Sequence, residues 1–173
     1  MIPKIKTAKD LARNMDLGPG YDGFIELVKS IELSDEEIAK HATWNNEHYT
    51  RNCLYSTPSI EVLLMCWKPG QHTPVHDYSF KEGWTKILKG QLLLEYFRVD
   101  ENGLVKTDEQ LLKEGDIAYL RDDLGVHRFI NESNENTVSL HIYAERIRKW
   151  NIFDDKGKAH EVIPEIDSKT EYC

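Results

Sequence analysis

The sequence predicts a mainly β fold, an antiparallel barrel or sandwich that follows a short helical segment. From about residue 59 the hydrophobic pattern has the period of short strands, and turn residues separate these strands at even spacing. No helical stretch lies between one strand and the next, which argues against parallel βαβ units. We therefore expect antiparallel pairing over most of the chain.

The N-terminal part of the sequence is predicted to be helical. Its apolar residues recur at helix spacing, and Ser34 followed by Glu37 resembles a capping box. In that motif the serine side chain accepts a hydrogen bond from the backbone N–H three residues later. A helix is therefore expected to begin directly after Ser34.

Length and composition indicate one domain. The 173 residues are 40% hydrophobic, which is enough to fill the core of one barrel. No internal repeat and no linker rich in Gly, Pro or Ser divides the chain. We expect a single domain over 1–173, with a helical segment at 1–45, a β-barrel at 46–153 and a loosely packed polar tail at 154–173.

Charge and hydropathy limit the expected partners. The 22 basic and 30 acidic residues give a net charge of −8, and no basic cluster is dense enough to bind a phosphate backbone. The longest apolar run, Val62–Trp67, is far shorter than the ~20 residues that span a bilayer. The first residues lack the apolar core of a signal peptide. We expect no nucleic acid or membrane partner, a cytoplasmic location, and a monomer or weak homo-oligomer.

The cysteines favour a reducing compartment. Cys53, Cys66 and Cys173 are odd in number and lack the C-x-x-C spacing of a zinc or redox pair. We expect all three to be reduced thiols, with Cys53 and Cys66 packed as small hydrophobic side chains.

Two histidines and a tyrosine are candidates for a metal site. His76 and Tyr78 lie two residues apart, so on an extended segment their side chains leave by the same face. His127 follows a later turn, and inward-facing histidines on neighbouring strands could place two imidazole nitrogens on one metal ion.

The last long strand, over residues 137–143, carries an unusual polar row. Its alternation sends Ser139, His141 and Tyr143 to one face. Each buried polar group left without a partner costs ~1–3 kcal/mol, so the three are expected to form a hydrogen-bonded relay.

Several short motifs together resemble a known family. The spacing of glycine and histidine over residues 70–90 and again over residues 115–131 resembles the two cupin motifs. Over roughly positions 45 to 145 the chain resembles cysteine dioxygenase. The motifs that carry this resemblance are Tyr49-Thr50-Arg51-Asn52, Cys66-Trp67 before Pro69-Gly70, His76-Asp77, Lys86 to Gly90, His127-Arg128 and Ser139-Leu140-His141-Ile142-Tyr143.

This resemblance implies a cupin fold, a double-stranded β-helix or jelly-roll barrel, and an enzyme of cysteine catabolism. In that family ferrous iron is bound by three histidines, and its open positions take the thiolate and amine of the substrate and dioxygen. The product is a sulfinate. By resemblance, His76 and His127 match two iron ligands, Arg51 matches the arginine that holds the substrate carboxylate, and Tyr49 matches its neighbour. The catalytic triad matches Ser139, His141 and Tyr143.

The sequence departs from the family at the remaining iron ligand, where Tyr78 replaces a histidine. A phenol has an ordinary pKa of ~10 and, once deprotonated, favours ferric over ferrous iron. Three outcomes are open: Tyr78 binds a shifted metal ion, it turns away and water fills the gap, or the site holds no metal. A weakened site with two histidines is the outcome we favour.

A second departure lies on the strand that follows. Gly83 occupies the place of a cysteine that crosslinks to the triad tyrosine in animal members, so no thioether to Tyr143 can form. Other cupins carry a glutamate ligand at that place. Glu82 is one residue away, so on an extended strand its side chain is expected to face outward.

Three functions remain under consideration. The leading hypothesis is an iron-dependent thiol dioxygenase that oxidises cysteine or a similar small thiol carboxylate with dioxygen, with Arg51 anchoring the acid and Tyr143 assisting oxygen. Because of Tyr78, the alternative is a non-catalytic or altered cupin that binds a small carboxylate. A metal-dependent cupin with a different reaction is the third, since a fold alone does not determine function.

Overall fold

The computed structural model describes residues 4–15, 24–79, 81–121 and 125–173 of the chain. Three short helices come first, as predicted, at Ala8–Met15 (α1), Phe24–Ser30 (α2) and Asp35–His41 (α3). Strands make up most of the remaining described residues. The predicted mainly β fold with N-terminal helices is therefore confirmed.

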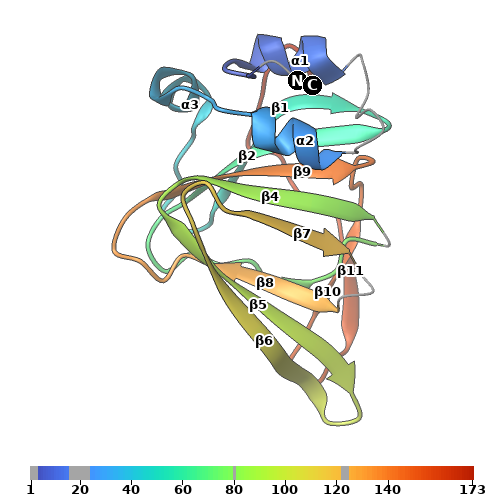
Figure 1. Ribbon diagram of the computed structural model, residues 1–173. Coiled ribbons are helices and arrows are strands. Elements are labelled where there is room, and N and C mark those ends of the chain that lie inside the picture. Colours follow the sequence, from blue (N-terminus) through green and yellow to red (C-terminus); the bar gives the residue numbers. More distant parts are fainter. Residues whose placement is uncertain (1–3, 16–23, 80, 122–124) are drawn as a thin grey trace.

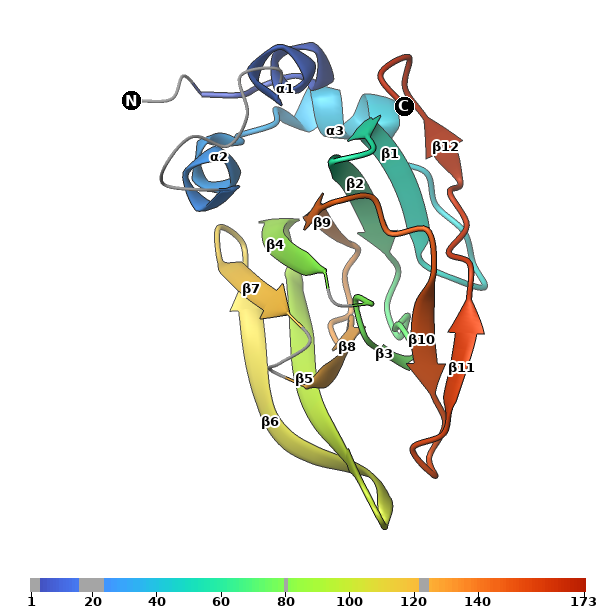
Figure 2. The ribbon, with the colours of Figure 1, turned by 90° about the vertical axis from the view of Figure 1, so that its right-hand side faces the viewer.

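The described strands form two six-stranded sheets that face each other (Figures 1 and 2). In spatial order, the first sheet contains β12 (Ser168–Lys169), β1 (Thr50–Thr57), β2 (Ile60–Trp67), β9 (Thr137–Ala144), β4 (Glu82–Lys89) and β7 (Ile117–Arg121). The second contains β11 (Ala159–Val162), β10 (Trp150–Phe153), β3 (Val75–His76), β8 (Val126–Ile130), β5 (Gln91–Asp100) and β6 (Gly103–Lys113). Pairing is antiparallel throughout except between β1 and β12.

Two hydrophobic cores lie on opposite faces of the first sheet. One packs the N-terminal helices against the outer face of β2 and β9, through residues such as Leu64 and Leu140. The other fills the space between the two sheets and includes Met65, Trp67 and Tyr143. Because side chains alternate along a strand, the helices bury the aliphatic face of β9. Its polar face is therefore directed into the barrel.

The start of α3 follows the predicted cap. The Ser34 hydroxyl accepts a hydrogen bond from the Glu37 backbone N–H at 3.2 Å. The Glu37 carboxylate does not return to Ser34 as in a full capping box. It accepts instead from the backbone N–H of Ala8 at 2.9 Å, which joins α3 to the start of α1.

Lys86 of β4 ties the helical segment to the barrel. Its ammonium group is buried and donates to backbone carbonyls at the end of α2, to Val28 at 3.2 Å, Lys29 at 3.2 Å and Ile31 at 2.7 Å. Carbonyls at a helix C-terminus lack intrahelical donors and carry partial negative charge. A single cation therefore satisfies several of them at once.

The C-terminal tail is packed on the barrel, so the prediction of a loose tail was wrong. Strand β11 extends one sheet beside β10, and β12 extends the other beside β1. Asp167 fixes the path between them, because its N–H donates to the Arg51 carbonyl and its carboxylate accepts from the Arg51 N–H, both at 2.8 Å. The polar composition of the tail reflects its exposed outer face.

Two of the three cysteines are joined, which corrects the prediction of three reduced thiols. Cys53 of β1 forms a disulfide with Cys173, 120 residues later. Cys66 is free and buried, as expected for a small hydrophobic side chain. Disulfides persist mainly in oxidising environments, so the cysteines no longer favour a reducing compartment. Separately, no helix within the described ranges is long and apolar enough to cross a membrane.

Thiol labelling tests this cysteine arrangement. Burial raises the pKa of the Cys66 thiol to about 11, so the native protein should label at none of its cysteines. Denatured protein should label at one cysteine without reductant and at all three after reduction. Labelling of three cysteines in denatured, unreduced protein, read by intact mass, would contradict the disulfide.

Candidate metal and substrate site

The two candidate histidines lie directly opposite each other in the second sheet. His76 of β3 pairs with His127 of β8 across the antiparallel ladder, and both side chains are buried. Their ring centroids are 4.4 Å apart. Opposed positions on one face of an antiparallel pair are the closest that two strands offer. The structure thus brings together the two histidines that the sequence singled out.

Each imidazole presents a nitrogen suited to a metal ion. The Nδ1 atom of His76 lies 2.9 Å from the Pro74 carbonyl, which can only accept, so Nδ1 carries the proton and Nε2 keeps its lone pair. The Nε2 atom of His127 is buried without a hydrogen-bond partner. Burial lowers the pKa of His76 to about 4 and that of His127 well below its ordinary value. Both rings are therefore neutral at pH 7, as metal binding requires.

Tyr78 fills the space beside this pair. Its ring is buried and packs edge-on against His127 and Tyr143, with centroid separations of 4.5 and 5.2 Å. Burial raises the pKa of Tyr78 well above its ordinary value, and the neighbouring Tyr143 raises it further. The side chain is therefore a neutral phenol, which is a poor metal ligand compared with phenolate.

Gly83 of β4 makes room for that ring. A Cβ atom at position 83 would lie 2.6 Å from Cε2 of Tyr78 and 3.2 Å from Cδ1 of Tyr143. Real Cβ contacts are not that short, so the tyrosine ring at 78 depends on the absence of a side chain at 83. The neighbouring Glu82 is exposed on the other face of the strand, as predicted.

The polar row on β9 is hydrogen-bonded, with partners that the sequence did not reveal. Ser139 Oγ lies 2.9 Å from Nε2 of His141 and accepts from the indole N–H of Trp67 at 2.9 Å. The other nitrogen of His141, Nδ1, lies 3.1 Å from the Thr85 hydroxyl. Both ring nitrogens of His141 are thus engaged. The side chain of Tyr143 interacts instead with Tyr78.

Arg51 of β1 is the candidate for binding a carboxylate. It is 4% exposed, and Nε, Nη1 and Nη2 all lack a hydrogen-bond partner. The guanidinium carbon lies 4.8 Å from the ring centroid of Trp150, a cation–π contact. Tyr49 stacks on Trp67 with centroids 4.5 Å apart; burial raises the pKa of its phenol, and the adjacent guanidinium of Arg51 opposes that rise. An unpaired buried guanidinium is costly, and a bound anion would offset that cost.

Two recesses open beside Arg51, and the C-terminal tail lines both. One, of about 220 Å³, lies between Tyr49, Trp150 and Asp167. The other, of about 230 Å³, includes Glu61 and Arg146. Neither Trp150 nor Glu61 was singled out from the sequence, because their position beside Arg51 depends on pairing between distant segments.

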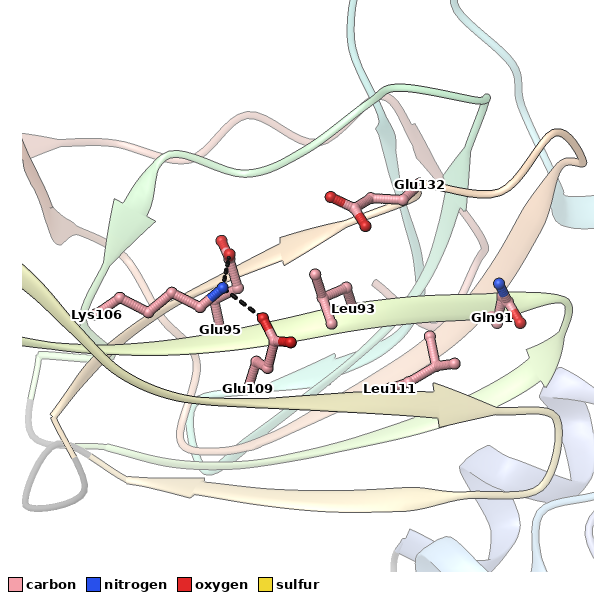
Figure 3. Close-up of a pocket in the computed structure, with 7 residues that line it drawn as sticks. All are labelled: Gln91, Leu93, Glu95, Lys106, Glu109, Leu111 and Glu132. Carbon is pink, nitrogen blue, oxygen red and sulfur yellow. Dashed lines mark hydrogen bonds and ion pairs between the residues drawn. The ribbon is translucent and has the colours of Figure 1, made fainter.

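A third hollow, of about 470 Å³, lies on the outer face of β5 and β6 (Figure 3). Most of its charged side chains pair: the ammonium of Lys106 contacts the carboxylates of Glu95 and Glu109, and Arg128 also binds Glu95, while Glu132 lies apart from them. These charges neutralise one another at the surface. The recesses beside Arg51 are therefore the better candidates for a ligand.

A double-mutant cycle tests the dependence of Tyr78 on Gly83. Gly83→Ala should lower the free energy of unfolding by about 1–3 kcal/mol, because the added methyl group overpacks the barrel core. In a Tyr78→Ala background the same change should cost much less, since the clashing ring is gone. Urea unfolding of the four proteins measures this, and an equal cost in both backgrounds would contradict the contact.

Comparison with known proteins shows which family the chain resembles. Residues 15–156 match the sequence model of the family described as cysteine dioxygenase type I. Cysteine dioxygenase type 1 of Bos taurus is 30% identical over 179 residues, covering 97% of this chain and 90% of the relative. The Homo sapiens protein has the same identity and coverage.

Within the part of the chain that the structure describes, no three His, Cys, Asp or Glu residues are grouped to hold a metal ion.

Solved structures confirm the cupin fold. TT1209 from Thermus thermophilus matches with a TM-score of 0.54 at 22% identity, over 66% of this chain and 98% of that one. A Klebsiella pneumoniae protein with a double-stranded β-helix domain matches with a TM-score of 0.52 at 20% identity, over 74% of this chain and 94% of that one. The sequence match extends across the helices, both histidines, Arg51 and β9. The chain therefore belongs to the cysteine dioxygenase type I family.

Proposed function

We propose that this protein is an iron-dependent thiol dioxygenase that oxidises cysteine, or a related small thiol carboxylate, to its sulfinate with dioxygen. One observation carries the proposal. A pair of buried neutral imidazoles, one with an unpartnered nitrogen, shares the barrel interior with a buried, unpartnered guanidinium. A thiol carboxylate could use both, with its sulfur at the histidines and its acid at Arg51.

The side chains present fit ferrous iron with two protein ligands. His76 would bind the ion through Nε2, because its Nδ1 atom carries the proton. His127 would bind it through Nε2, which has no hydrogen-bond partner. Tyr78, which is a neutral buried phenol in the metal-free protein, would occupy the place of the third ligand, and we propose that it does not bind the metal. When bound, iron would supply the redox chemistry that joins the substrate sulfur to dioxygen.

Arg51 would bind and orient the substrate. Its planar guanidinium can donate two parallel hydrogen bonds to a carboxylate, and Trp150 holds it in place. Its positive charge reaches the site: burial is the main cause of the lowered pKa of His76, and Arg51 acts in the same direction. A bound carboxylate would neutralise that charge.

The residues of β9 would position a proton donor. Burial raises the pKa of Tyr143 to about 12, so its hydroxyl stays protonated and can donate a hydrogen bond to an oxygen atom. Ser139 and His141 lie on the same strand face and are held in place by hydrogen bonds to each other, to Trp67 and to Thr85. We also propose a cytoplasmic location and a monomer or weak homo-oligomer; the disulfide between Cys53 and Cys173 is the observation that counts against the location.

A second function, metal-free binding of a small carboxylate, has its own support. Tyr78 occupies the position at which the third ligand is expected. Its ring centroid lies 4.5 Å from that of His127. If that packing excludes metal, Arg51 still offers an anion site. Metal content and turnover separate the two functions.

The iron content should be close to one per chain in protein purified with ferrous iron present. Elemental mass spectrometry measures it. His127→Ala removes one of only two proposed ligands and should abolish binding, whereas the matched control His160→Ala, at an exposed position, should leave it unchanged. Absence of iron and of every other metal from the unaltered protein would favour the carboxylate-binding function.

Iron-loaded protein should consume oxygen with cysteine and form a sulfinate. Arg51→Ala should lower kcat/KM by roughly 100-fold, since it removes charge-assisted hydrogen bonds to the substrate. Arg98→Ala, which removes an exposed arginine on β5, is the control for the loss of one positive charge. No oxygen uptake by a sample with full iron would count against thiol dioxygenation, and turnover of non-thiol substrates alone would indicate another cupin reaction.

A further inference from the structure

Asp77 is a half-buried carboxylate that lies between His76 and Tyr78 and has no part in the proposed reaction. Its Oδ1 atom accepts from the backbone N–H groups of Asn151 at 2.9 Å and of Ser79 at 3.1 Å. Its Oδ2 atom accepts from the side-chain amide of Asn151 at 2.8 Å. One carboxylate therefore binds three amide donors, and two of them belong to a single residue of β10.

These contacts extend the pairing of a very short strand. β3 consists of Val75 and His76, which pair with β10 beside it (Figure 2). The same register places Asp77 opposite Asn151, and the Asp77 N–H donates to the Asn151 carbonyl at 3.1 Å. In a regular antiparallel pair the return bond would go to a backbone carbonyl, but here it goes to the Asp77 carboxylate. The side chain thus holds the segment to β10 just before the backbone turns at Ser79, whose φ of 51° is unusual for a residue other than glycine.

The neighbour of Asn151 on β10 is Trp150, and its ring contacts both parts of the candidate site. The ring centroid lies 4.6 Å from that of His76 and 4.8 Å from the guanidinium carbon of Arg51. All three side chains are buried. Because a packed interior leaves little room for adjustment, the place of the Trp150 ring sets how far the guanidinium lies from the imidazole. That place depends in turn on the contacts of Asn151.

Each partner of this contact is therefore adjacent in sequence to a residue of the site. We propose that Asp77 and Asn151 are positioning residues: they fix β10 against the segment of His76, so that Trp150 keeps Arg51 at a set distance from the imidazole. That iron and a carboxylate bind at the two ends of this distance rests on the proposed function. A ligand that reaches both ends at once would be sensitive to the distance, since a misplacement of about 1 Å can lower a rate by ~100-fold.

Exchange of the two side chains tests the proposal, because the contact has a donor side and an acceptor side. A carboxylate only accepts, so the side chain of Asn151 presents its NH₂ group to Asp77. Asp77→Asn would set two NH₂ groups against each other, and Asn151→Asp would set two carboxylates against each other. The double variant Asp77→Asn/Asn151→Asp restores one donor and one acceptor in the reverse direction. Its amide oxygen at position 77 can still accept from the two backbone N–H groups.

Proton NMR of the metal-free protein reads the position of the Trp150 ring without ligand or turnover. An aromatic ring shifts the resonances of nearby protons by an amount that falls steeply with distance, so His76 Cε1–H and Arg51 Nε–H both report on it. Trp150→Leu gives the values expected without the ring. Both resonances should move toward those values in Asp77→Asn and in Asn151→Asp, and they should return in the exchange variant.

The matched control is Asp100→Asn, which alters another carboxylate that accepts from the backbone N–H two residues later, and it should move neither resonance. Resonances that stay in place in both single variants, or that do not return in the exchange variant, would overturn the proposal. Movement in opposite directions would also overturn it, because one variant removes a carboxylate and the other adds one, so charge alone would explain the result. If melting curves show that a single variant does not fold, Asn151→Ala replaces it under the same criteria.

Kinetics separate this inference from the dioxygenase proposal. In the iron-loaded protein, kcat/KM for cysteine should fall by roughly 10- to 100-fold in each single variant and recover in the exchange variant. Resonances that follow the prediction in a protein without oxygen uptake would uphold the positioning role and count against the dioxygenase. Unmoved resonances in a protein that oxidises cysteine would uphold the dioxygenase and overturn the positioning role.

Discussion

The packing of the Tyr78 ring in the barrel core is the contact on which the arrangement of the site depends. The ring lies edge-on to both His127 and Tyr143, and it has room only because position 83 carries no side chain. The neighbouring Nε2 atom of His127 is buried without a hydrogen-bond partner. The hydroxyl of Tyr143 interacts with Tyr78 rather than with His141. The two ring nitrogens of His141 are hydrogen-bonded to Ser139 and Thr85. The residue at position 78 thus affects the surroundings of the proposed ligand His127 and of Tyr143 together.

The two cores explain why the remaining site residues face one another. Helices cover the outer face of β2 and β9 and bury its aliphatic side chains, so the alternate side chains are directed between the sheets. A polar row there is stable only when its members are bonded, and Trp67 and Thr85 supply the missing partners. The tail, paired with β1 and joined to it through Cys173, lines the recesses beside Arg51.

Much of this could be predicted from local sequence patterns. The alternation of side chains along a strand predicted the shared face of Ser139, His141 and Tyr143 and the outward direction of Glu82. The same two-residue period predicted the strands themselves. The motif around His76 and His127 identified the family. These features depend on a few neighbouring residues, so one sequence contains them. The structure of the tail was predicted wrongly, because a polar strand at the edge of a sheet has the composition of a loose tail.

Other features depend on pairing between distant segments and could not be found in this way. The bond between Cys53 and Cys173 spans 120 residues. From the sequence alone, Glu61 would be predicted as a surface charge, because its burial follows only from the pairing of β2 with β9. The contact of Thr85 with His141 likewise follows only from the pairing of β4 with β9. The role of Tyr78 depends on the direction of its ring and on the protonation of its hydroxyl, neither of which the sequence specifies.

The affinity for ferrous iron of three proteins, the unaltered chain, Tyr78→Phe and Tyr78→His, tests the role of Tyr78 most directly. If Tyr78 only fills space beside a two-histidine site, Tyr78→Phe should bind iron as tightly as the unaltered protein. Tyr78→His should then bind at least about tenfold more tightly, because it adds a third imidazole. A marked loss of affinity in Tyr78→Phe would mean that the phenol oxygen is itself a ligand, and it would contradict this assignment of the site.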